Sequence, residues 1–239
     1  MVVKPRRGLE KMHSFWMDVL PEPGAVFRLP PEEESHLFRI LRARPGETVR
    51  LLDGKGGSAE AEVRSGRELE LVSRRTAPVP EQQLILACAA PRRQKLDTLL
   101  KQAVELGAWE IRLMQCARSV AKPEGASRWQ TLLREACKQS GNLFLPRIEV
   151  HDSLADALDS LADARLFFGA VRPPDAPVPP VPAAGRSVFL AGPEGGFTPE
   201  EEAALAARGA VGISLGPWIL RLETAAVAGL AVLRTRGAE

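Results

Sequence analysis

The 239-residue chain is 45% hydrophobic and 26% charged, a composition typical of a soluble globular protein with one large or two modest domains. Its net charge of +2 excludes a strongly basic field, and no apolar run approaches the length of a membrane span. The three cysteines have neither disulfide nor metal-ligand spacing, so we expect buried, reduced thiols in a cytosolic protein without a metal. Residues 1–11 are polar and basic, and a disordered extension is expected there.

Short extended runs separated by turn signals occupy residues 13–76. Strands are expected at residues 15–17, 25–29, 48–52, 58–63 and 69–73, with one helix at residues 31–43. Strands at this spacing favour a small β-barrel. Arg39, Arg42, Arg44, Arg50 and Lys55 form either a face that contacts RNA phosphates or an ordinary solvated surface.

A proline-rich linker near residue 79 separates this region from a different pattern, so we expect domains at residues 1–78 and 79–239. Beyond the linker, apolar runs at residues 84–90, 111–114, 166–170, 188–191 and 213–215 alternate with helical patterns, including those at residues 95–106, 129–140 and 154–161. This alternation predicts an α/β domain with a mostly parallel sheet. The proline- and alanine-rich residues 172–185 are expected to form a surface loop.

Two glycine-containing turns each follow a short expected strand and each lead into an expected helix. The first contains Gly192, Gly195 and Gly196 and ends at Thr198, which suits a helix cap, and the second contains Gly216. Glycines allow a ligand to approach the backbone closely. Because the carboxyl ends of parallel strands meet at one edge of a sheet, the two turns predict a crevice for a small ligand. Neither turn has the spacing of a P-loop or a dinucleotide fingerprint.

These motifs, in this order, resemble the RsmE family of 16S ribosomal RNA (uracil-N3)-methyltransferases, within the SPOUT superfamily. The resemblance rests on GPEGGFTPEE, LGPWILRLETAAVAGLAVL, HLFRILRARPGETVRLLDGKG, KQAVELGAWEIRLMQCARSV and REACKQSGNLFLPRI. It implies a PUA-like barrel that helps to hold RNA, followed by an α/β methyltransferase domain with a C-terminal trefoil knot. It further implies S-adenosylmethionine as cofactor, a homodimer, and 16S ribosomal RNA of the small subunit as partner.

The resemblance and the residues together define a candidate site. Arg221 is the candidate for stabilising the uracil anion and Glu223 for orienting Arg221, although Glu223 and Thr224 also suit an ordinary helix start. The target base must be unpaired or flipped, since N3 is occupied in a base pair. RNA contacts are expected from Arg39, Arg42, Arg44, Lys55, Arg118 and Trp218. Cofactor contacts are expected from Leu190, Gly192, Pro193, Glu194, Gly195, Gly196, Leu215, Gly216, Ile219, Leu220, Arg221, Thr224 and Ala225.

Three features depart from the family pattern. The family usually has a basic residue where Trp218 stands and an arginine where Asn142 stands, and an arginine is missing at His13 and Ser14. These departures concern RNA contacts more than the cofactor turns. Two alternatives remain open: a related knotted methyltransferase with a different RNA or a ribose target, and a non-catalytic RNA-binding assembly protein. The second would bind RNA in a salt-dependent manner without binding the cofactor.

Overall fold

The computed structural model describes residues 12–159, 161–170 and 180–237. The expected extension at residues 1–11 and much of the expected loop at residues 172–185 lie outside the described residues. The chain divides into two compact units. The first extends to Val79 and includes Cys137–Phe144, and the second comprises Pro80–Ala136 and the residues from Leu145 onward. Among the described residues, no helix has the length and apolar character needed to cross a membrane.

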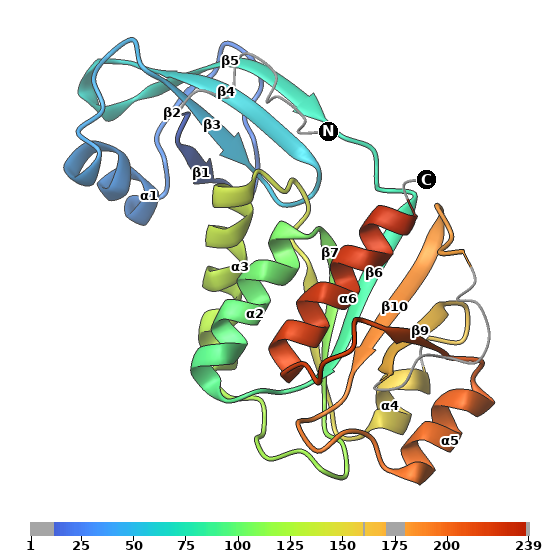
Figure 1. Cartoon of the computed structure of the whole chain (residues 1–239). Coiled ribbons are helices and arrows are strands. Elements are labelled where there is room, and N and C mark those ends of the chain that lie inside the picture. The colour runs from blue at the N-terminus through green and yellow to red at the C-terminus, as the bar shows by residue number, and fades with distance from the viewer. Residues whose placement is uncertain (1–11, 160, 171–179, 238–239) are drawn as a thin grey trace. The chain divides into compact units, whose positions relative to one another are not determined.

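The first unit is built on a five-stranded sheet with the order β1-β3-β4-β5-β2 (Figure 1). β1 runs parallel to β3, and the other neighbouring strands are antiparallel. The five predicted strands of this region are therefore confirmed, with their ends shifted by a few residues. Their bounds are β1 (Ser14–Trp16), β2 (Val26–Phe27), β3 (Thr48–Leu52), β4 (Gly57–Val63) and β5 (Leu69–Thr76).

The helix predicted at residues 31–43 is shorter and changes character along its length. It begins as α1 (Pro31–Ser35) and continues as a π-helical turn at His36–Ile40. The amide of Leu41 donates to the carbonyl of His36, five residues back, at 3.0 Å. Arg42 then adopts a left-handed conformation with φ 58°, which ends the helix.

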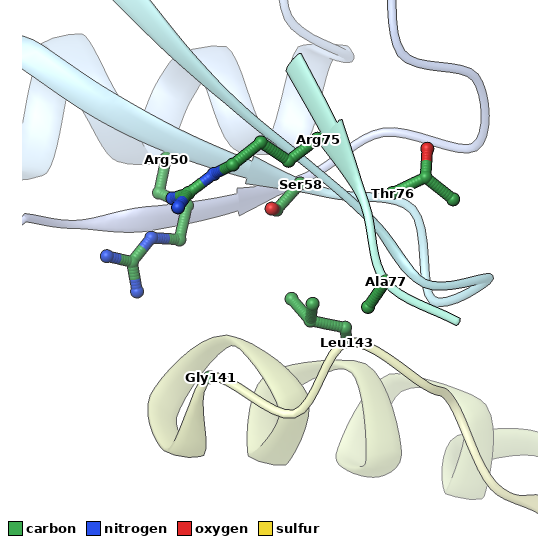
Figure 2. Close-up of a pocket in the computed structure, with 7 residues that line it drawn as sticks. All are labelled: Arg50, Ser58, Arg75, Thr76, Ala77, Gly141 and Leu143. Carbon is green, nitrogen blue, oxygen red and sulfur yellow. The ribbon is translucent and has the colours of Figure 1, made fainter. Parts of the chain in front are cut away.

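An open pocket of about 380 Å³ lies in the first unit (Figure 2). Side chains from β3, β4 and β5 line it together with the segment that follows α3 (Ala126–Ser140). The lining residues are Arg50, Ser58, Arg75, Thr76, Ala77, Gly141 and Leu143.

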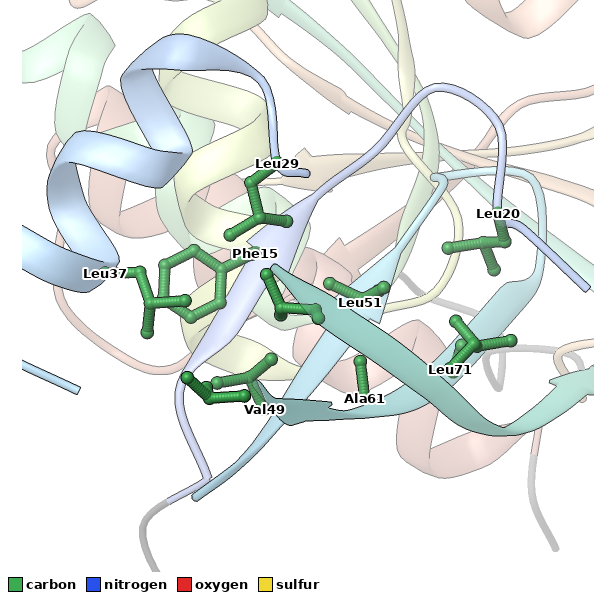
Figure 3. Close-up of a cluster of buried hydrophobic side chains, with 11 residues drawn as sticks. Phe15, Leu20, Leu29, Leu37, Val49, Leu51, Ala61 and Leu71 are labelled. Atoms are coloured by element: carbon green, nitrogen blue, oxygen red, sulfur yellow. The ribbon is translucent and has the colours of Figure 1, made fainter. Parts of the chain in front are cut away.

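The opposite face of these strands encloses one cluster of buried apolar side chains (Figure 3). Along β3, Val49 and Leu51 are buried whereas Arg50 between them is not, as expected where successive side chains point to opposite faces. Leu37 of the π-helical turn and Phe15 of β1 belong to the same cluster. The cluster forms a hydrophobic core for the expected small barrel-like unit.

The second unit contains a six-stranded sheet in which every neighbouring pair is parallel, in the order β11-β9-β10-β6-β7-β8. This confirms the predicted α/β domain with a parallel sheet. One strand, β8 at the sheet edge, was not expected. The strand bounds are β6 (Gln82–Ala89), β7 (Ala108–Met114), β8 (Arg147–His151), β9 (Arg165–Ala170), β10 (Gly185–Ala191) and β11 (Val211–Ser214).

Two helices, α2 (Arg93–Glu105) and α6 (Leu222–Arg236), lie side by side over this sheet (Figure 1). α6 packs on β6, β9 and β10, and a Cβ atom at Gly229 would overlap the ring of Phe189. Glycine at this position therefore allows close helix–sheet packing. The unit also contains α4 (Leu154–Asp159), α5 (Pro199–Ala207) and the part of α3 up to Ala136. β10 lies between β9 and β6, so the strand order reverses beside its carboxyl end, where ligand sites of open α/β sheets are found.

Candidate active site

The first glycine turn leaves the carboxyl end of β10 and leads directly into α5. The amide of Gly196 donates to the carbonyl of Pro193 at 2.8 Å, and Gly196 has a left-handed φ of 71°. Thr198 and Glu201 then form a reciprocal cap. The Thr198 hydroxyl accepts from the Glu201 amide at 3.2 Å, and the Glu201 carboxylate accepts from the Thr198 amide at 2.9 Å. The predicted cap at Thr198 is confirmed, and it fixes where the turn ends.

The loop that follows β7 holds this turn from the side. The guanidinium of Arg118 donates to the carbonyls of Gly195 at 2.9 Å and Phe197 at 3.2 Å. A Cβ atom at Gly195 would lie 3.3 Å from the side chain of Arg118, so glycine permits this close approach. The second carboxylate oxygen of Glu201 accepts from the amide of Ala117 at 2.8 Å. Arg118 thus binds the turn, and the RNA contact expected from it stays a prediction.

The second turn follows β11 and is held more loosely. The Ser214 hydroxyl donates to the carbonyl of Gly216 over 3.4 Å, and Gly216 has φ 129°. Trp218 and Ile219 are 81% and 84% exposed. Arg221 is exposed and caps α6 through its carbonyl, which accepts from the amide of Ala225 at 2.8 Å.

The other expected cofactor residues divide between the surface and the core. Glu194, Gly195, Gly196 and Thr224 are exposed, whereas Leu190 and Pro193 are buried. The partly buried members are Gly192, Leu215, Leu220 and Ala225. The two buried residues would support the first turn from beneath rather than present a side chain to a ligand.

Glu223, at the start of α6, has an ion-pair partner that the sequence did not suggest. One carboxylate oxygen lies 2.9 Å from Nζ of Lys95 on α2, and the other, Oε2, is buried without a hydrogen-bond partner among the described residues. Burial alone would raise the pKa of Glu223. The hydrogen bond from Lys95, a backbone hydrogen bond, and the charges of Lys95 and Arg221 outweigh it, and together they lower this pKa. Glu223 is therefore ionised at neutral pH, and its expected role in orienting Arg221 stays a prediction.

The basic residues expected to contact RNA lie on the surface of the first unit. Arg39, Arg42, Arg44 and Lys55 are all exposed, and Lys55 also donates to the carbonyl of Asp18 at 3.2 Å. Asn142, where the family pattern has arginine, accepts from the amide of Phe144 at 3.0 Å and so closes a local turn.

All three cysteines are buried, as predicted. Burial raises the pKa of Cys88, Cys116 and Cys137 to about 12, so none is a thiolate nucleophile at neutral pH. In the described ranges, no group of three or more histidine, cysteine, aspartate or glutamate residues is arranged to hold a metal ion.

Comparison of the sequence and structure with known proteins identifies the family of this chain. The sequence matches the model of an RNA methyltransferase domain over residues 78–234 and that of an RNA methyltransferase PUA domain over residues 29–72. A ribosomal RNA small subunit methyltransferase E from Mycobacterium tuberculosis is 31% identical over 232 residues, which cover 90% of this chain and 88% of that protein. The protein of the same name from Bacillus subtilis is 26% identical, covering 89% and 91% of the two chains.

Among solved structures, a ribosomal RNA small subunit methyltransferase E from Neisseria gonorrhoeae bound to S-adenosyl methionine is 28% identical. The similarity covers 94% of this chain and 98% of that one, with a TM-score of 0.81. The matches therefore extend over both units, the PUA domain and the parallel-sheet domain. The chain belongs to the ribosomal RNA small subunit methyltransferase E family, RsmE.

Proposed function

We propose that this protein transfers a methyl group from S-adenosylmethionine to N3 of a uridine in 16S ribosomal RNA of the small subunit. Its relatives are named as ribosomal RNA small subunit methyltransferases, and the Neisseria relative is bound to S-adenosyl methionine. The observation that carries the proposal is the first glycine turn, held by Arg118 and Glu201 at the carboxyl end of β10. Uracil N3 as the acceptor rests on the sequence resemblance to the uracil-N3 methyltransferases.

The residues of the two turns fit this cofactor. No atom lies within 4 Å of the position that a Cβ would take at Gly196 or Gly216, so the backbone of both turns is open to a ligand. The Oε2 atom of Glu223, at the start of α6 after the second turn, is buried without a hydrogen-bond partner among the described residues. The turns would hold the adenosine and methionine groups with backbone N–H and C=O groups. A trefoil knot around this site is a further part of the proposal.

When bound, S-adenosylmethionine supplies an electrophilic methyl group on a sulfonium. Uracil N3 becomes nucleophilic only after it gives its proton to the solvent, and a cation beside the base stabilises the anion that results. Arg221, exposed at the start of α6, is the proposed cation. The charge of Arg221 contributes to the lowered pKa of Glu223, which is itself fixed by its ion pair with Lys95. The remaining work of the site is positioning the base.

We further propose that the protein acts in the cytoplasm, as a homodimer, on RNA of the small subunit. The exposed apolar side chains of Trp218 and Ile219, beside the second turn, support a partner that covers them. In the proposed dimer a second copy of the chain provides that cover.

The test incubates the protein with cofactor carrying a labelled methyl group and, in separate reactions, with undermethylated small subunits or free 16S RNA, and then maps the modified nucleotide. Label at N3 of one uridine is the expected result. Label on a ribose 2′-oxygen or in another RNA would favour a related methyltransferase. RNA binding with no cofactor binding would favour an assembly protein. A matched Gly195→Val variant should lose cofactor affinity and keep its fold, since the added methyl groups would meet Arg118.

A further inference from the structure

We propose that the pocket on the outer face of the five-stranded sheet binds an unpaired nucleotide of the RNA substrate, with its phosphate at Arg50 and Arg75 and its base against the apolar wall. We call it the Arg50–Arg75 pocket and define it by the lining residues given above. The inference deepens the proposed function, since it rests on RNA being the substrate. It adds a subsite that is separate from the glycine turns.

Strand register explains why the two arginines meet at one pocket. Arg50 on β3 pairs with Glu60 on β4, and Ser58 on β4 pairs with Arg75 on β5. Side chains alternate along each strand, so Arg50 points away from the core that holds Val49 and Leu51. Figure 2 shows Arg50, Ser58 and Arg75 projecting from the strands toward the segment that carries Gly141 and Leu143.

The pocket has an excess of positive charge. Arg75 lies 3.9 Å from a carboxylate oxygen of Glu60, at the limit of an ion pair, and its side chain is 74% exposed. The guanidinium of Arg50 makes no hydrogen bond or ion pair with any described residue. Two guanidinium groups thus face one carboxylate, and their planar donors match the oxygens of a phosphate.

Ser58 adds a hydroxyl group to the polar side of the pocket. The residue is 8% exposed and lines the pocket, yet its hydroxyl forms no hydrogen bond with the residues that the structure describes. Its Oγ is not among the buried side-chain atoms that lack a partner, so the hydroxyl is open to the solvent in the pocket. A ribose 2′-hydroxyl or a base edge is a partner of suitable chemistry, and both are accessible in unpaired RNA.

Part of the remaining wall is apolar and fixed in place. Ala77 and Leu143 contribute it, and backbone hydrogen bonds of 2.9 Å join each of them to Gly56. The partly buried ion pair of Lys138 with Glu33, at 2.8 Å, anchors the helix end that precedes Leu143. A volume of about 380 Å³ falls within the range of small-ligand pockets. A preformed apolar slot beside two arginines suits a base that is not stacked in a duplex.

The test measures fluorescence anisotropy with a labelled single-stranded RNA of about eight nucleotides. Matched arms use the same sequence as a blunt duplex and as a strand with abasic sites. Arg50→Ala and Arg75→Ala should each weaken binding of the single strand by about tenfold and lower the salt slope by about 0.7. Ala77→Trp, which fills the pocket, should weaken binding of the single strand and leave binding of the abasic strand unchanged.

Arg64→Ala is the charge-matched control, because Arg64 is already paired with Glu62 and Glu70 at 2.8 Å. If Ala77→Trp melts at a lower temperature than the wild type, its RNA binding is not informative, and the same binding measurement is made with the milder Ser58→Ala variant. Equal loss of affinity in Arg64→Ala and Arg50→Ala, or equal binding of the single strand and the duplex, would overturn the pocket. If the wild type methylates RNA but the pocket variants bind RNA as tightly as the wild type, the proposed pocket is wrong and the proposed function stands. RNA binding that depends on the pocket, without cofactor binding, would overturn the proposed function alone.

Discussion

Arg118→Ala tests whether the first glycine turn is held in its binding shape by the loop after β7. The substitution removes two hydrogen bonds, to the carbonyls of Gly195 at 2.9 Å and Phe197 at 3.2 Å. Because Arg118 is exposed, each bond is worth about 1 kcal/mol at most. If the free energy that holds the turn in its binding conformation falls by about 1–2 kcal/mol, the cofactor affinity should weaken roughly tenfold. The melting temperature should fall by only a few degrees.

Isothermal titration calorimetry with S-adenosylmethionine measures the affinity, and thermal unfolding without ligand measures the stability. Arg208→Ala is the matched control in the same unit. The guanidinium of Arg208 also donates to a backbone carbonyl, that of Leu158 at 3.0 Å, and pairs with Asp159 at 2.7 Å. The control should show a similar fall in melting temperature and an unchanged cofactor dissociation constant. Wild-type affinity in Arg118→Ala, or an equal loss in Arg208→Ala, would refute the argument.

Three further outcomes follow from the packing and charges of buried and partly buried side chains. Lys95→Met should lower the unfolding free energy at pH 7 by less than about 1 kcal/mol, since the ion pair with Glu223 is partly exposed. The lowered pKa of Glu223 stabilises the fold above the ordinary value of 4.5, so the difference between Lys95→Met and wild type should vanish as the pH falls below it. Gly229→Val should cost about 1–3 kcal/mol in urea unfolding, because its side chain would overlap Phe189. The three buried thiols should resist Ellman's reagent until the chain unfolds. Their raised pKa values stabilise the fold fully below pH 9.0, and this stability should be lost as the pH rises toward about 12, with a shallower loss in Cys88→Ala.

Local patterns were enough to predict most of the fold. The apolar runs of β6 and β10 are short, continuous and bounded by turns, so they identify buried parallel strands. β8 was missed because Arg147 and Glu149 interrupt its apolar residues, and an edge strand needs only one apolar face. The early end of the first helix depends on the left-handed Arg42, a conformation that side-chain periodicity does not reveal.

The candidate site was predictable only where its residues are neighbours in the sequence. The glycines and the Thr198 cap occupy one short stretch, and their local chemistry marks a strand–turn–helix unit. The contact of Arg118 with Gly195 joins residues 77 positions apart, and Lys95 and Glu223 are further apart still. Pairs of this kind depend on the strand order of the sheet. From the sequence alone, an exposed loop arginine such as Arg118 is equally consistent with an RNA contact and with a structural contact to another loop.

The two turns differ in how firmly they are held, and this difference bears on cofactor binding. The first turn is fixed by Arg118 and by Glu201, which accepts hydrogen bonds from both Ala117 and Thr198. The second has one long bond of 3.4 Å, and its Trp218 and Ile219 are almost fully exposed in the single chain. A site with one rigid and one loosely held wall binds weakly until the second wall is ordered. If the proposed dimer orders it, cofactor affinity should rise with protein concentration over the range in which dimers form, as measured by calorimetry beside sedimentation. A dissociation constant that is the same above and below that range would show that one chain completes the site alone.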